Sequence, residues 1–174
     1  MYPIAFNDFL LAEERRAYLE NLSDAKKECV FCATVPALTR TPGQVGTVYV
    51  IAVFEHTFVV VNPYPYVPKG HVMIVTKRHI ADYRDLTDEE ITEIFHTVLP
   101  RVQAALTKEY IKITGFNIGM NIGDFAGRSI EHLHVHVVPR MKNEAGFMEA
   151  TAGTRVMSES AEQTMQRIAK HFGA

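Results

Sequence analysis

The stretch His132-Leu133-His134-Val135-His136-Val137-Val138-Pro139-Arg140 alternates histidine with apolar residues and then reaches a proline. Strict alternation predicts a half-buried strand over residues 130–138, which Pro139 would end. Side chains of a strand point to opposite faces in turn, so the three histidines would share one face. The apolar residues between them would point into the core. We expect the side chain of His134, the middle histidine, to face a cleft on the surface.

Three histidines on one strand face allow three interpretations. They could form a solvated polar face, although other polar residues would serve there equally well. They could ligate a metal, since neutral imidazole is a common zinc ligand. They could also carry nucleophilic or acid–base chemistry, because imidazole titrates near physiological pH and can attack phosphorus. The residues of the strand alone leave all three interpretations open.

The rest of the chain predicts an α+β fold with a mostly antiparallel sheet. Thr87 and Glu90 form a capping-box pattern that opens a long helix over residues 87–110, which Pro100 could kink. Prolines and glycines make residues 36–46 a loop. Residues rich in β-branched and aromatic side chains predict strands at 47–54, 57–61, 71–76 and 116–122. Further helices are predicted over residues 7–20 and 158–172.

Length, composition and charge exclude several classes of protein. The 174 residues are 47% hydrophobic and 22% charged, which is ordinary for a globular chain and excludes global disorder. A net charge of −2 gives no electrostatic footprint for nucleic acids or anionic membranes, and no apolar run is long enough for a membrane helix. The first residues do not read as a signal peptide, and two cysteines exclude a disulfide framework. We therefore expect a cytoplasmic protein.

Cys29 and Cys32 form a second short motif, Cys-x-x-Cys. Free cysteines often behave as small buried hydrophobic residues. A redox pair is a second interpretation, although no helix clearly begins after Cys29 in the sequence pattern. With suitable histidines the pair could instead form half of a Cys₂His₂ zinc site.

Three motifs in order resemble the histidine triad (HIT) family. The first is His-φ-His-φ-His-φ-φ followed by Pro-Arg, where φ is an apolar residue. The second is the approach to it over Asn121–Glu131, and the third is Asn62–Val75, with Gly70 and His71 before an apolar strand. Within the family, the chain is most similar to the diadenosine tetraphosphate phosphorylase branch. The resemblance implies a HIT-like fold and a single domain over residues 1–174, with a core at about 47–140, an N-terminal segment 1–46 and a C-terminal extension 141–174.

The resemblance also implies the catalytic residues. His134 would be the nucleophile that attacks the α-phosphorus of a nucleotide and forms a nucleotidyl-histidine intermediate. His136 would hold the scissile phosphate or the leaving oxygen. No cofactor is then required for the chemical step. Arg128 stands where the family often has Gln or Gly, so its role stays open, as does that of His71.

The family implies substrate-binding residues as well. Asn121 and Ser129 would supply neutral hydrogen-bond donors, and Gly127 would let a backbone amide approach the phosphate. Asn62 would bind the ribose. A turn before Pro63 is the second interpretation of Asn62, and an ordinary loop hydroxyl is the second interpretation of Ser129.

Some HIT proteins carry a structural zinc ion, and the matching positions here are Cys29, Cys32, His79 and His132. The competing interpretation is a pair of inert thiols beside a surface histidine. Resemblance further implies a homodimer that extends the sheet across a two-fold axis.

The predicted activity is nucleotidyl transfer from a dinucleoside polyphosphate to phosphate or to water. A nucleoside phosphoramidase is the second enzyme that would fit the same residues. A zinc-stabilised nucleotide-binding module without turnover is a third hypothesis, and a metal-dependent hydrolase that uses the triad as ligands is a fourth. Cys29 and Cys32 argue against the hydrolase, because they offer softer ligands at a separate closed site.

Overall fold

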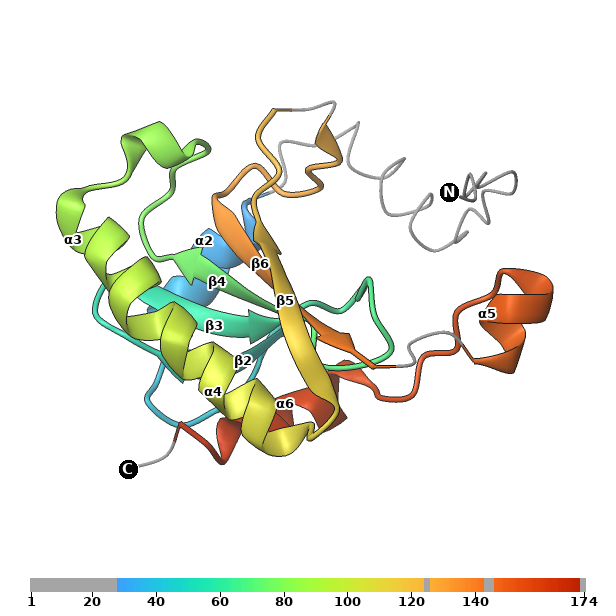
Figure 1. The fold of residues 1–174 in the computed structure, drawn as a ribbon. Helices are drawn as coiled ribbons and strands as arrows, with labels where there is room; N and C mark the ends of the chain where they lie inside the picture. The colour runs from blue at the N-terminus through green and yellow to red at the C-terminus, as the bar shows by residue number, and fades with distance from the viewer. Residues whose placement is uncertain (1–27, 124–125, 143–145, 173–174) are drawn as a thin grey trace.

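A computed structural model describes residues 28–123, 126–142 and 146–172 of the chain (Figure 1). The helix predicted over residues 7–20 lies outside these described residues. Their main feature is one sheet in the order β1-β2-β3-β4-β6-β5, in which every neighbouring pair is antiparallel. The strands are β1 (Gly43–Val45), β2 (Val48–Val53), β3 (Thr57–Val61), β4 (Val72–Thr76), β5 (Ile113–Gly119) and β6 (His134–Met141). The predicted α+β class with an antiparallel sheet is confirmed.

The two last strands are shifted from their predicted positions. β5 spans residues 113–119 instead of 116–122, and β6 spans 134–141 instead of 130–138. Both strands run further than expected at one shared end, where Ile113 pairs with Met141. Pro139 therefore does not end the strand. It pairs with Phe116 of β5, beyond Val137 where the pairing with β4 stops, so β6 has a strand on only one side there and tolerates a missing N–H.

The predicted long helix is present as three consecutive segments, α3 (Asp88–Thr92), η3 (Glu93–Val98) and α4 (Leu99–Glu109). The capping box forms as predicted, since the Thr87 hydroxyl accepts from the Glu90 amide and the Glu90 carboxylate accepts from the Thr87 amide. η3 is a π-helical segment, in which the Leu99 amide donates to the Ile94 carbonyl. Pro100 has no N–H to continue the α-helical ladder, which accounts for the wider turn before it.

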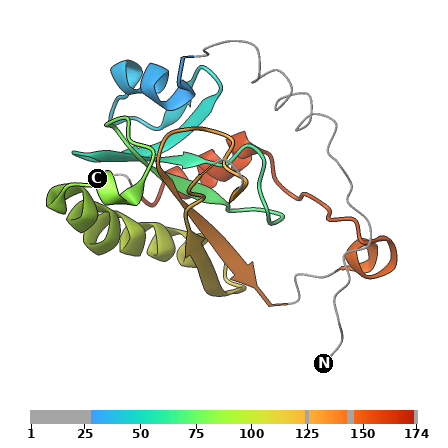
Figure 2. The same ribbon diagram turned by 90° about the horizontal axis from the view of Figure 1, so that it is seen from above.

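The sheet has an apolar core on each face. On one face Val135 and Val137 of β6 pack with residues of α4 and with Ile168 of α6 (Ala161–Ala169). On the other face Phe31 of α2 (Val30–Thr34) packs on β2, β3 and β4. Figure 2 shows α2 and the long helix on opposite sides of the sheet. β6 thus presents valines to one core and histidines to the other face.

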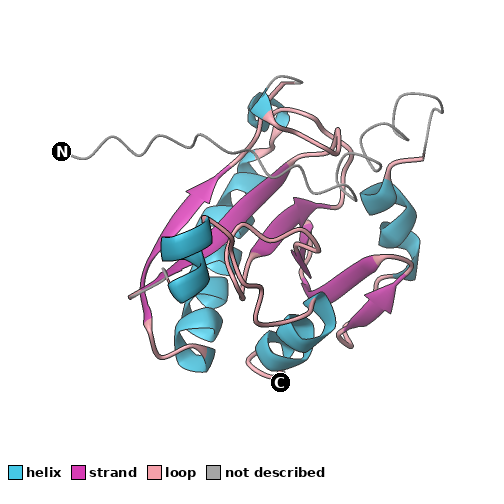
Figure 3. Ribbon diagram, turned by 90° about the vertical axis from the view of Figure 1, so that its right-hand side faces the viewer, coloured by secondary structure: helices cyan, strands magenta, loops and turns pink. Residues whose placement is uncertain are grey.

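The segments before β2, before the long helix and after β6 contain elements that the sequence pattern did not predict. α2 begins directly after Cys29, contrary to expectation, because the Ala33 amide bonds to the Cys29 carbonyl and closes a helical turn. η1 (Val35–Ala37) follows α2, and β1 occupies part of the predicted loop 36–46. η2 (Tyr83–Asp85) precedes the long helix, and α5 (Phe147–Ala152) precedes α6, which is shorter than the predicted helix 158–172. Figure 3 shows the helices around the strands of the sheet. Across the described residues no helix is both long enough and apolar enough to span a membrane.

Candidate active site and metal centre

A backbone carbonyl just before β6 holds the His134 ring in one tautomer. Its Nδ1 atom lies 2.7 Å from the carbonyl oxygen of His132, so Nδ1 carries the proton and donates it. In a neutral imidazole the other nitrogen, Nε2, is then a bare lone pair. Burial, which outweighs the hydrogen bond to His132, lowers the pKa of His134, and the positive charge of Arg128 acts in the same direction. His134 therefore has the electronic form that a nucleophile requires.

His134 is more buried than the sequence suggested. Its side chain is 6% exposed, because the Phe31 ring packs edge-on against it at a centroid distance of 5.8 Å. The expectation of a surface-facing side chain is therefore wrong. His132 is also placed differently, since it precedes β6 and is not one of its strand residues. Its Nδ1 atom lies 3.3 Å from Cys29 Sγ, and the Phe31 ring packs edge-on against the rings of both His132 and His134, which therefore lie on the same side of the sheet.

His136 is the next histidine on that face, with its ring centroid 4.8 Å from that of His134. Its Nδ1 atom lies 3.0 Å from Nε2 of His71. The amide of Tyr66 donates to Nδ1 of His71 at 3.0 Å, so the proton of His71 is on Nε2 and is donated to His136. His136 therefore carries its own proton on Nε2.

That N–H of His136 has no hydrogen-bond partner. Among the described residues, His136 Nε2 is the one buried side-chain nitrogen or oxygen in this condition. A buried donor without a partner is costly and rare in folded proteins. Its position beside His134 fits a donor that is kept for an oxygen atom of a bound molecule.

Burial also keeps the supporting histidines neutral. It lowers the pKa of His71 to about 3 and that of His136 to about 4, with the neighbouring histidines contributing in the same direction. Both rings are therefore uncharged at neutral pH, as the assigned proton positions require. Sequence reasoning left the role of His71 open. The sequence did mark this residue, because Gly70-His71 precedes an apolar strand. The hydrogen bonds that define the role of His71 could not be predicted, since they depend on a loop without regular structure.

The structure places Asn62 beside this chain of histidines. Its side chain is 7% exposed, and Oδ1 accepts from the Tyr64 amide at 2.9 Å, which is the turn interpretation. Its Nδ2 atom lies 3.3 Å from Nδ1 of His71. Asn62 thus starts the turn and also lies next to the catalytic candidates, so the two interpretations are compatible.

The other predicted binding residues lie on the loop that leads into β6. Asn121 Nδ2 donates to the Gly127 carbonyl at 3.4 Å, and Gly127 has a φ of 81°, which favours glycine. Ser129 follows on the same loop. Arg128 donates to the Ala81 carbonyl at 3.4 Å and so connects this loop to the segment after His79.

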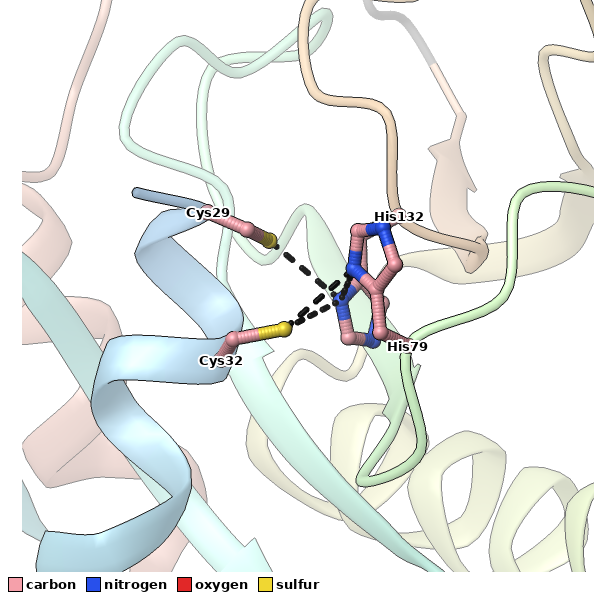
Figure 4. Close-up of side chains that lie close together, drawn as sticks. All are labelled: Cys29, Cys32, His79 and His132. Atoms are coloured by element: carbon pink, nitrogen blue, oxygen red, sulfur yellow. Dashed lines mark hydrogen bonds between the residues drawn. The ribbon is translucent and has the colours of Figure 1, made fainter. Parts of the chain in front are cut away.

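The four predicted metal ligands come together (Figure 4). Their ligand atoms, two sulfurs and two Nδ1 nitrogens, all lie within 4.8 Å of one another. His132 Nδ1 is 3.3 Å from Cys29 Sγ and 3.2 Å from His79 Nδ1. His79 Nδ1 is 3.2 Å from Cys32 Sγ.

This cluster fits a tetrahedral zinc ion. Bond lengths of about 2.3 Å to sulfur and about 2.1 Å to nitrogen separate the ligand atoms of such an ion by about 3.4–3.8 Å, the longest separation being between the two sulfurs. The separations that involve the histidine nitrogens, 3.2–3.6 Å, are close to these values. His132 is also in the correct tautomer, because its Nε2 donates to the Thr76 carbonyl at 2.7 Å and leaves Nδ1 bare toward the cluster. Burial and the nearby Cys29 raise the pKa of Cys32 to about 11, and a cation would offset this by stabilising the thiolates.

Comparison with known proteins identifies the family of the chain. The HIT domain matches residues 46–143, more than half of the chain, so the chain belongs to the HIT family. The chain is 37% identical over 124 residues to the AP-4-A phosphorylase of Mycobacterium tuberculosis. That match covers 71% of this chain and 62% of the relative, so the chain spans less than two thirds of its length.

Two further matches support the family and the fold, respectively. The chain is 38% identical over 89 residues to the asymmetrical bis(5'-nucleosyl)-tetraphosphatase of Schizosaccharomyces pombe, covering 51% of this chain and 46% of that protein. A zinc-bound histidine triad family protein from Mycobacterium smegmatis has a similar structure, with a TM-score of 0.62 at 24% identity. The match covers 83% of this chain and 92% of the Mycobacterium smegmatis chain.

Proposed function

We propose that this protein transfers a nucleotidyl group from a dinucleoside polyphosphate, through a covalent intermediate on His134, to phosphate or water. The observation that carries the proposal is the fixed tautomer of His134. Its Nδ1–H is held by the His132 carbonyl at 2.7 Å, which leaves Nε2 bare beside the unused N–H of His136.

The first step follows from these two nitrogens. The Nε2 lone pair of His134 attacks the α-phosphorus, a P–N bond forms, and the P–O bond to the leaving polyphosphate breaks. The Nε2–H of His136 donates a hydrogen bond to the departing oxygen. Inorganic phosphate or water then attacks the same phosphorus, a new P–O bond forms, and the P–N bond breaks with its electron pair returning to Nε2 of His134. The proton that an attacking water loses passes to the solvent.

The neutral donors around the histidines would bind the phosphate. We assign Asn121, Gly127 and Ser129 to the phosphate oxygens and Asn62 to the ribose. Such groups stabilise developing charge by fixed dipoles. The relatives named AP-4-A phosphorylase and bis(5'-nucleosyl)-tetraphosphatase support a substrate of this class.

We propose that Cys29, Cys32, His79 and His132 hold a zinc ion whose contribution is structural. A bound ion would fix the His132 backbone, whose carbonyl accepts from His134. The chemical step itself is assigned to the histidines and the neutral donors.

We also propose a homodimer. β5 is an edge strand of the sheet, and Ile118 on it is 41% exposed, so a second copy could extend the sheet there. Light scattering after gel filtration tests this proposal, since a monomer at micromolar concentration would contradict it.

The activity is tested by product analysis of diadenosine tetraphosphate with and without inorganic phosphate. ADP and ATP that form only with phosphate indicate a phosphorylase, whereas AMP and ATP without phosphate indicate a hydrolase. Adenosine phosphoramidate, assayed in parallel, tests for a nucleoside phosphoramidase. Failure to turn over any dinucleoside polyphosphate would contradict the proposal.

A further inference from the structure

The C-terminal part of the chain crosses the loop that precedes His71. We call residues 153–160 the strap and residues 62–70 the proline loop. Both the amide and the hydroxyl of Ser158 donate to the Pro68 carbonyl, at 3.1 and 3.3 Å. The guanidinium of Arg155 donates to the Tyr66 carbonyl. The strap is therefore hydrogen-bonded to the proline loop at two separate carbonyls.

A second set of contacts holds the end of the strap in place. Glu159 accepts from the Tyr110 hydroxyl at 2.7 Å and from Thr164 of α6 at 3.2 Å. Lys69 of the proline loop also contacts Tyr110, since its Nζ atom lies 5.3 Å from the ring centroid. The strap and the proline loop thus share one anchor at the C-terminal end of α4.

The proline loop in turn holds the supporting histidine. The Tyr66 amide donates to His71 Nδ1, and the Tyr66 ring lies 4.7 Å from the His71 ring and 5.5 Å from the His136 ring. Three prolines and no regular secondary structure leave this loop few backbone bonds of its own. Its conformation at Tyr66 depends on contacts from outside, which the strap supplies.

We propose that the strap is a positioning element of the active site, in which Arg155 holds the proline loop at Tyr66 and Ser158 holds it at Pro68, so that His71 and His136 keep their proton positions. This inference rests on the proposed function for its kinetic consequence, but the proton positions can be observed without substrate. The strap lies outside residues 46–143, the part that matches the HIT domain. The positioning role would therefore be supplied by the C-terminal extension of this chain.

The first test is nuclear magnetic resonance of the full chain labelled with ¹⁵N-histidine. Two-bond ¹H–¹⁵N correlations distinguish an Nε2–H ring from an Nδ1–H ring. His71 and His136, assigned through His71→Asn and His136→Asn, should each show a single Nε2–H pattern in the wild type. Arg155→Ala should broaden the ¹H–¹⁵N signals of both rings or add an Nδ1–H pattern to them. The signals of His56, in the turn between β2 and β3, should not change.

Further variants separate positioning from general stability. Arg155→Lys keeps a donor for the Tyr66 carbonyl and should retain the wild-type pattern. Arg40→Ala removes the same charge from an exposed loop position and is the matched control. Arg155→Ala combined with Ser158→Pro also removes the Ser158 amide and hydroxyl and should enlarge the effect. Thermal melting monitors folding throughout.

Kinetics supply the second readout. Arg155→Ala should lower kcat by about tenfold while KM changes by less than about threefold, because positioning of His136 affects the leaving step more than binding. Unchanged histidine patterns in Arg155→Ala would overturn the inference, and so would a fall in activity matched by Arg40→Ala. If the wild type turns over no dinucleoside polyphosphate, the proposed function fails, while the histidine patterns still decide the role of the strap.

Discussion

The backbone carbonyl of His132 accepts a hydrogen bond from His134, and the side chain of the same His132 belongs to the candidate metal site. One residue therefore connects the two centres. Its ring is fixed by the Thr76 carbonyl on one side and faces the cysteines on the other. Any change that displaces His132 should reach His134, the proposed nucleophile, through a single hydrogen bond.

His134→Ala should lower turnover by several orders of magnitude, because water seldom replaces a covalent nucleophile. His134→Asn and His134→Gly should behave alike. Since His134 is buried, we expect a modest loss of melting temperature from the cavity. His96→Ala, at an exposed position on the long helix, is the control. More than about a tenth of the wild-type rate in His134→Ala would mean that another group attacks phosphorus.

Protein purified without chelator should contain about one equivalent of zinc per chain, measured by elemental analysis. His132→Ala should lower both the zinc content and the melting temperature, as well as activity. Cys29→Ser should lower zinc content and melting temperature with a smaller direct effect on His134. Less than about a tenth of an equivalent of zinc in the wild type would contradict the assignment.

His71→Asn should lower kcat by about ten- to a hundredfold, because His136 would lose the donor that fixes its proton on Nε2. The KM for a dinucleoside polyphosphate should change less than kcat. His171→Asn, which alters a histidine bonded to Glu109 of α4, is a control of the same chemistry and should leave kcat unchanged. A His71→Asn variant with wild-type kcat would show that the hydrogen bond from His71 to His136 does not support the reaction.

The free energy of unfolding should fall as the pH drops from about 7 toward 4. The pKa of His71 and His136 is lowered to about 3 and about 4 in the folded state, so the unfolded chain binds more protons in this window. The full free energy of unfolding is present above a pH of about 6.5, which is the pKa of histidine in the unfolded chain. Below that pH, each histidine lowers the free energy of unfolding by about 1 kcal/mol per pH unit. Urea titrations at several pH values measure the slope. His71→Asn, which lacks one of the buried histidines, should show a shallower dependence, and an equally steep one would contradict the assignment.

Much of the fold could be predicted because the determinants are local. The alternation of β6, the capping box at Thr87 and the β-branched runs each fix their own element. Strand limits were less accurate for β5 and β6, since their ends depend on pairing with each other. α2 is short, and one turn of helix leaves no periodicity to detect.

The candidate site, like the fold, could be predicted from the sequence only in part. Cys29, Cys32, His79 and His132 were identifiable by residue type and by resemblance, and the structure brings their ligand atoms together. The proton positions on His71 and His136 were not predictable, because they depend on where an irregular loop places the Tyr66 amide. The strap was missed for a similar reason, since Arg155 and Ser158 carry no pattern in the sequence.

The pairing of β4 with β6 places Met73 opposite His136 and Val75 opposite His134, while Val135 and Val137 enter the other core. A slip of one residue in this pairing would exchange valines and histidines between the faces. The two roles of the strand are therefore inseparable, because the same register that excludes water from the valine core also decides which imidazoles line the candidate active site. A one-residue insertion within β6 should invert the site, whereas an insertion before Ser129 could be absorbed by the loop.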